Sequence, residues 1–130
     1  MNSLLDWSAP VLTVGDPVEA IGMRAGLGAE VNSMLAMAML SGPVLAYRGT
    51  PERWIFLTAP ATSTSNAVLA DLVRLGVSLF PMGSLVSLPC TDNLEIARWV
   101  NRPLPGRPLP PWQAVVAAVR RTSSVSSGWL

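Results

Sequence analysis

The chain has 130 residues, which is the size of a single domain. Half of its residues are hydrophobic and 13% are charged, yet no apolar run reaches the ~20 residues that a membrane-spanning helix needs. The formal net charge of +1 gives no overall field that would attract nucleic acid or an anionic membrane surface. We therefore expect one compact domain with no membrane partner.

Several kinds of chemistry are excluded by residues that the sequence lacks. Histidine is absent, so the commonest general base near neutral pH is missing. Lysine is absent too, which excludes a Schiff base and a P-loop. The single cysteine, Cys90, cannot form an internal disulfide or a zinc site by itself, and we interpret it as a small, half-buried residue. The start of the chain has no basic segment before its Leu-Leu pair, which predicts a cytoplasmic protein without a secretory signal.

The N-terminal part predicts an arm, a strand and a helix. Residues 1–15 would form an arm or edge strand in which Trp7 is the anchor. Val18 to Met23 alternates as a short strand does. From near Gly26 to Leu40 the apolar residues follow a helical stripe: Leu27, Val31, Met34, Leu35 and Ala38. Met37 and Met39 fall outside this stripe, and they can be core residues or an adaptable binding surface.

Gly42 to Ala59 predicts a hairpin at the centre of the sheet, with its loop at Gly49 to Glu52. We expect Arg48 to face Arg53 across this loop. One side of the hairpin would then carry Tyr47 with Trp54 and Leu45 with Phe56, and the other side Val44, Ala46, Ile55 and Leu57. Because both sides are apolar, helices should cover at least one of them.

The remaining elements follow from stripes, caps and breakers. A helix over 67–75 would be capped by Ser65 or Asn66. Strands over 77–80 and 84–88 would pair as a second hairpin, and Ala97 to Asn101 would be a further strand. Five prolines make residues 102–111 extended, either as a stiff strap around the domain or as a ligand for an SH3-type domain. A helix would follow over 112–121, and residues 123–130 would be a serine-rich tail.

This order of elements predicts an α+β fold with a single domain at 16–122. Its first part is the β-α-β-β-α-β order of ferredoxin-like and RNA-recognition folds, an antiparallel sheet with two to three helices on one face. If the aromatic residues of the hairpin lie on the other face, they form a platform on which bases stack: Tyr47, Trp54 and Phe56. The alternative is that these side chains fill the core.

Two weaker candidate sites lie before and at the first helix. Asp16 and Glu19 are the only pair of carboxylates that we would consider for a metal ion, although Pro17 between them favours a solvated turn. Gly22, Gly26 and Gly28 could place backbone amides around a phosphate, but their spacing does not match a dinucleotide fingerprint. We expect no cofactor.

Three segments carry a family resemblance: GPVLAYRGTPERWIFLTAPATS, LVRLGVSLFPMGSLVSLPCT and ARWVNRPLPGRPLP. From about Asp16 to Arg121 the chain resembles short actinobacterial proteins related to the N-terminal domain of bifunctional primase/polymerases (prim-pol). That family uses an acidic metal-binding motif with histidine and basic residues. The matching stretch here is at best Asp16-Pro17-Val18-Glu19, so the resemblance implies a reduced, non-catalytic relative.

The functional hypothesis is a non-enzymatic, cytoplasmic accessory domain that binds another protein or a second copy of itself. The alternative is a binder of nucleotides or single-stranded nucleic acid, which the net charge does not support. Residual nucleotidyl transfer is the third hypothesis. The candidate binding residues are the hairpin aromatics with four arginines: Tyr47, Arg48, Arg53, Trp54, Phe56, Arg98 and Arg102.

Overall fold

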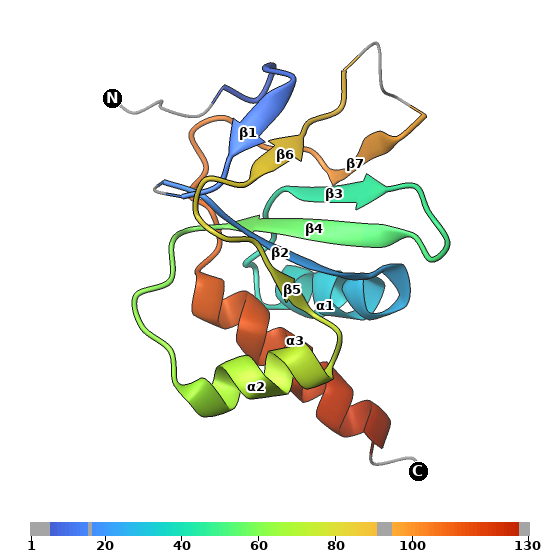
Figure 1. Cartoon of the computed structure of the whole chain (residues 1–130), viewed down its shortest axis with the longest axis vertical. Coiled ribbons are helices and arrows are strands. Elements are labelled where there is room, and N and C mark those ends of the chain that lie inside the picture. Colours follow the sequence, from blue (N-terminus) through green and yellow to red (C-terminus); the bar gives the residue numbers. More distant parts are fainter. Residues whose placement is uncertain (1–5, 16, 91–94, 128–130) are drawn as a thin grey trace.

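The fold is described from a computed structural model, which describes residues 6–15, 17–90 and 95–127 (Figure 1). These residues form seven strands and three helices. In chain order they are β1 (Val11–Thr13), β2 (Glu19–Arg24), α1 (Ala25–Met37), β3 (Val44–Tyr47), β4 (Arg53–Thr58), α2 (Asn66–Arg74), β5 (Ser78–Leu79), β6 (Leu85–Ser87), β7 (Ala97–Asn101) and α3 (Trp112–Ser127). The predicted α+β class and the single small domain are confirmed.

The larger sheet has five strands in the order β5-β2-β4-β3-β7, and every neighbouring pair is antiparallel. The three helices lie together on one side of this sheet (Figure 1). The order β5-β2-β4-β3 places the strand after the second helix beside the strand before the first helix. It is therefore compatible with the predicted β-α-β-β-α-β arrangement, to which β7 adds one edge strand.

The face of the sheet under the helices holds the larger core, which we call the helix-side core. Its strand residues include Ile21, Met23, Val44 and Phe56, all nearly inaccessible to solvent. The helices add apolar side chains from their inner stripes: Val31, Leu35, Leu72, Trp112, Val115, Val116, Ala118 and Val119. Helix α3 thus supplies a large part of this core, although its residues lie far along the chain from β2.

Helix α1 can approach the sheet closely because Gly28 has no side chain. A Cβ atom at Gly28 would lie 3.0 Å from Cε3 of Trp54 and 3.1 Å from its Cβ. Few real contacts of a Cβ atom are so short, so the indole of Trp54 fills the space that a larger residue at Gly28 would need. The sequence predicted Gly28 at the start of this helix. In the structure, the lack of a side chain at Gly28 allows α1 to pack closely on β4.

The opposite face of the sheet is covered by a small second sheet in which β1 pairs with β6 (Figure 1). Between the two sheets lies the strand-side core: Leu12, Val14, Val18, Ala20, Leu45, Ile55, Leu57, Val86 and Leu88. The predicted second hairpin is therefore wrong. Instead, β5 pairs with β2, and β6 pairs with β1, because both segments find apolar partners earlier in the chain. The arm before β1 packs through Trp7, whose ring meets that of Trp99 edge to face at 6.0 Å.

The central hairpin forms as predicted, but its register differs by one residue. Tyr47 lies opposite Arg53, and Ala46 lies opposite Trp54. The loop is longer than expected because the N–H of Arg48 donates to the carbonyl of Ile96, next to β7, and does not pair with β4. A shift of one residue moves side chains to the other face, so Tyr47 and Trp54 point to opposite sides of the sheet.

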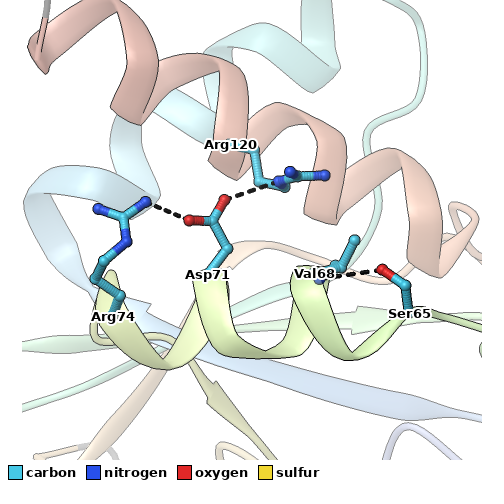
Figure 2. Close-up of polar contacts among 5 residues, drawn as sticks. All are labelled: Ser65, Val68, Asp71, Arg74 and Arg120. Atoms are coloured by element: carbon cyan, nitrogen blue, oxygen red, sulfur yellow. Dashed lines mark hydrogen bonds and ion pairs between the residues drawn. The ribbon is translucent and has the colours of Figure 1, made fainter.

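Helix α2 is held at both ends by polar contacts (Figure 2). The hydroxyl of Ser65 accepts a hydrogen bond from the N–H of Val68, which confirms the predicted cap. The carboxylate of Asp71 forms ion pairs with Arg74 of the same helix and with Arg120 of α3, at 2.9 Å from Nε of Arg120. Helix α3 continues to Ser127, which takes it into the segment expected to be a tail, and Trp129 lies outside the described residues.

Candidate functional site

The structure does not bring the aromatic residues of the hairpin together on an open face. Phe56 is buried in the helix-side core, and the half-buried Trp54 packs against that core under α1. Tyr47 lies on the other face and packs against the strand-side core. Its hydroxyl donates to the carbonyl of Ser87, and burial raises the pKa of Tyr47 above its usual value. The predicted stacking platform is therefore wrong, and the alternative of core aromatics is correct.

The four candidate arginines do not converge either. Arg98 donates to the carboxylate of Glu52 at 2.6 Å, and Arg48 adds a favourable charge there. The hydrogen bond from Arg98 is the main reason why the pKa of Glu52 is lowered. Arg53 instead donates to the hydroxyl of Ser78 at 2.9 Å. Arg102 follows the far end of β7 and is separated from Arg98 by most of that strand.

The carboxylate pair considered for a metal ion gains no support. Asp16 lies outside the described residues. Glu19 accepts a hydrogen bond from the N–H of Ala61 at 2.9 Å, so its carboxylate anchors the loop that follows β4. In the part of the chain that the structure describes, no three carboxylate or cysteine side chains gather as metal ligands would. Glu19 thus has a structural role.

One hollow of the described surface is lined by part of the proline-rich segment 102–111, which we call the strap. The strap connects β7 to α3 without regular secondary structure. Its far end is fixed because the carbonyl of Pro110 accepts a hydrogen bond from the N–H of Ala59 at 2.9 Å. Pro110 also packs on Gly42 so closely that a Cβ atom at Gly42 would lie 2.3 Å from Cδ of Pro110.

The near end of the strap is fixed by an asparagine pair. The side-chain amide of Asn101 donates to Oδ1 of Asn32 on α1 at 2.8 Å and to the carbonyl of Gly42 at 3.1 Å. Between these two anchors the strap forms no strand, because each proline fixes φ and removes a hydrogen-bond donor. The segment therefore lies on the domain without a helix or strand and is attached at both ends, which agrees with the predicted extended conformation.

A groove of about 550 Å³ lies between the strap and the body of the domain. Its volume is within the range of pockets that bind small molecules. Most of its wall is apolar. The lining residues come from the arm, from the segment before β3 and from the strap: Trp7, Pro17, Ser41, Gly42, Pro43, Ala59, Asn101 and 102–109.

The rim of the groove combines apolar and basic side chains. Leu104 is 53% exposed although it is a large hydrophobic residue. Arg102 and Arg107 are also exposed. In the described ranges, the carboxylates that form ion pairs are Glu52 and Asp71, with other arginines, so neither rim arginine has an ion-pair partner there. An occupant with apolar groups and a carboxylate would match this rim.

Sequence reasoning named Arg102 and the strap but did not predict the groove. Such a hollow needs Trp7, the Gly42 segment and the strap to meet, and they are far apart in sequence. One feature of the sequence pointed to it: the prolines between β7 and α3 predict a segment that cannot join a sheet as a strand, because proline has no N–H to donate.

Comparison of the chain with family models, with curated proteins and with solved structures finds no significant match. Over the described residues, no helix has the length and apolar character needed to cross a membrane.

Proposed function

We propose that this domain is a protein-interaction module that binds an apolar segment of another protein in the groove under the strap. The observation that carries the proposal is the groove itself, an apolar hollow of about 550 Å³ whose rim carries two arginines without ion-pair partners in the described residues. Apolar side chains in the groove would supply most of the binding free energy. Carboxylates meeting Arg102 and Arg107 would fix the orientation of the segment.

The rigidity of the strap supports this proposal. A flexible loop would have to be ordered on binding, which costs free energy for each residue immobilised. Here the strap is held by prolines and by anchors at Pro110 and Asn101. The groove is thus formed before a partner arrives, which is the usual condition of a binding site.

The alternative of a binder of nucleotides or single-stranded nucleic acid has less support. Binding of single strands relies on exposed aromatic side chains that stack on bases. Trp54 and Phe56 pack in or against the helix-side core, and Tyr47 lies on the opposite face. The groove offers Trp7, but this residue is already packed edge to face on Trp99.

A displayed library of random peptides, selected on the purified domain, tests the proposal. We expect enrichment of peptides that combine aromatic or aliphatic residues with acidic residues. Leu104→Asp should abolish binding of the selected peptides, because it places a charge at the rim of an apolar groove. Leu85→Asp is the matched control, since Leu85 is 69% exposed and lies outside the groove.

Selected peptides that bind both variants equally well would contradict the proposal. A second pair of variants tests the charge of the rim. Arg102→Glu should weaken acidic peptides about tenfold, whereas Arg121→Glu on the exposed side of α3 should leave their affinity unchanged.

A further inference from the structure

The second half of the strap, residues 107–111, is restricted to an extended conformation by its own prolines. Its sequence is Arg-Pro-Leu-Pro-Pro. Each proline fixes its own φ at about −65° and keeps the residue before it out of the helical region. Every residue of this stretch is a proline or precedes one, and the structure has no helix or strand there. The stretch therefore has the backbone preferences of a polyproline helix, and we call it the polyproline stretch.

The first half of the strap carries the same four residues, Arg-Pro-Leu-Pro, but a turn follows them. The N–H of Arg107 donates to the carbonyl of Leu104 at 3.0 Å, and Gly106 between them has φ of 82°. Proline followed by glycine with a positive φ is typical of a type II turn, which reverses the direction of the chain. The turn therefore interrupts the longer pattern Arg-x-x-Pro-x-x-Pro over 102–108, and the continuous stretch begins at Arg107.

One ridge of the polyproline stretch is free, while the rest of it is attached to the domain. A polyproline helix has about three residues per turn, so Pro108 and Pro111 lie on the same ridge. Both of these residues are exposed. Pro110 is buried, and its carbonyl accepts from the N–H of Ala59, while Leu109 packs against the strand-side core. The domain thus presents a Pro-x-x-Pro ridge that is already ordered.

The chemistry of this ridge specifies what can bind it. Prolines offer ring surfaces and carbonyl acceptors but no N–H, so a partner has to supply apolar faces together with hydrogen-bond donors. Tryptophan and tyrosine side chains supply both. Arg107 is exposed at one end of the ridge, and the ion pairs of the described ranges involve other arginines. A carboxylate of the partner would therefore match Arg107.

We infer that the polyproline stretch is itself a ligand, and that an aromatic-lined groove of another protein, of the kind that SH3-type domains carry, binds it. Pro108 and Pro111 pack between the aromatic rings, and a carboxylate at the edge of that groove pairs with Arg107. Because the stretch is ordered before binding, little conformational entropy is lost. This inference goes beyond the proposed function, in which a segment of a partner enters the groove under the strap.

A second copy of the chain does not fit this ridge. The groove under its strap contains one aromatic residue, Trp7, and its rim carries Arg102 and Arg107. These rim arginines would repel the incoming Arg107, since like charges placed together disfavour a complex. Over the described residues, no aromatic side chain belongs to the exposed class, so the rest of the surface offers no set of aromatic rings either. The partner is therefore a different protein.

Titration calorimetry with purified SH3-type domains tests the inference. Domains with acidic residues beside their aromatic groove should bind, and domains with a neutral rim should bind about tenfold more weakly. Pro111→Ala and Pro108→Ala should each weaken binding about tenfold, because each removes one of the two rings on the ridge. Pro105→Ala is the matched control, since Pro105 is equally an exposed proline of the strap but lies in the turn. Its affinity should be unchanged.

The outcomes separate this inference from the proposed function. If no SH3-type domain binds, or if the Pro108 and Pro111 variants bind as well as the unmodified domain, the inference is wrong. Equal weakening by Pro105→Ala would show that the turn opens on binding, which would overturn the assignment to 107–111. Pro111 lies outside the groove. Selected peptides that lose affinity with Leu104→Asp but not with Pro111→Ala would thus support the groove whatever the SH3-type domains do.

Discussion

Replacing Trp54 by alanine should destabilise the whole domain, because Trp54 is a packing residue. Its indole lies between β4 and α1 and contacts the helix-side core. A tryptophan side chain buries roughly 150 to 250 Å² when fully enclosed. Taking about three quarters of that area for Trp54, most of which is buried, at about 25 cal/mol per Å², gives roughly 3 to 5 kcal/mol. The space left under Gly28 adds to this cost, so we expect a loss of about 4 kcal/mol.

This loss is large for a domain whose total free energy of unfolding is about 5 to 15 kcal/mol. Urea denaturation followed by far-ultraviolet circular dichroism measures it without relying on the fluorescence of the tryptophan removed. The contact with Gly28 provides an internal check. Gly28→Ala should destabilise the unmodified domain by about 1 kcal/mol or more, since the new Cβ atom would lie 3.0 Å from the indole. In the Trp54→Ala background the same change should be neutral or stabilising, because alanine favours a helix.

The opposite pattern would refute this reasoning. A loss below about 1 kcal/mol for Trp54→Ala, together with weaker ligand binding, would make Trp54 an exposed binding residue. Additive effects of the Gly28 and Trp54 changes would show that the two residues do not contact each other in solution.

Two further predictions concern the strap and the helices. Gly42→Ala should lower the free energy of unfolding by about 3 kcal/mol and disturb the groove, because its Cβ atom would lie 2.3 Å from Cδ of Pro110. Gly26→Ala is the control, and it should not destabilise the domain, because its Cβ atom would meet no atom within 4 Å. Equal urea midpoints for the two variants would contradict this prediction. The hydrogen bonds from Arg74 and then Arg120 hold the pKa of Asp71 below its usual value. The stabilisation that the ionised Asp71 contributes is therefore complete above about pH 4 and is lost as pH falls through its lowered pKa. In Asp71→Asn the free energy of unfolding should fall less steeply with decreasing pH than in the unmodified domain. An unchanged slope of the free energy of unfolding against pH would contradict this prediction.

The sequence predicted elements well where a local signal exists. Alternation found β2, the hairpin loop with its breakers located β3, and the apolar stripe found α1 within a few residues of its ends. The serine before α2 indicated the cap, because a side-chain oxygen at that place can accept a hydrogen bond from a free amide of the first turn. Strand β7 has the bounds that alternation predicted. Each of these features depends on residues within about one turn or strand.

Pairing between elements was less predictable, and the hairpin shows why. A one-residue shift is normally visible because it exposes the apolar face of a strand. Here both faces of β3 and β4 are covered, so Leu45 and Val44 are equally suited to either side. The N–H of Arg48 pairs with the carbonyl of Ile96 beside β7 and not with β4, and this contact joins residues that are more than a third of the chain apart. The predicted stacking platform assumed the wrong register, so the prediction of the platform was wrong as well.

The groove and the backbone conformation of Met39 could not be predicted from the sequence, for a different reason. Met39, just after α1, is left-handed with φ of 60°, and methionine, unlike glycine, does not indicate a left-handed residue. The groove in turn depends on where the strap passes, which is set by contacts of Pro110 and Asn101 with distant segments. The sequence did leave Met37 and Met39 outside the core stripe, and that observation is confirmed by their exposure.

The position of α3 has a consequence for how this protein is made. Helix α3 packs on α1, and the hydroxyl of Thr122 contacts the sulfur of Met34, 88 positions earlier in the chain. During translation, the sheet and the first two helices emerge before the residues that cover them. Until Trp112 and the valines of α3 leave the ribosome, the nascent chain exposes much of its helix-side core.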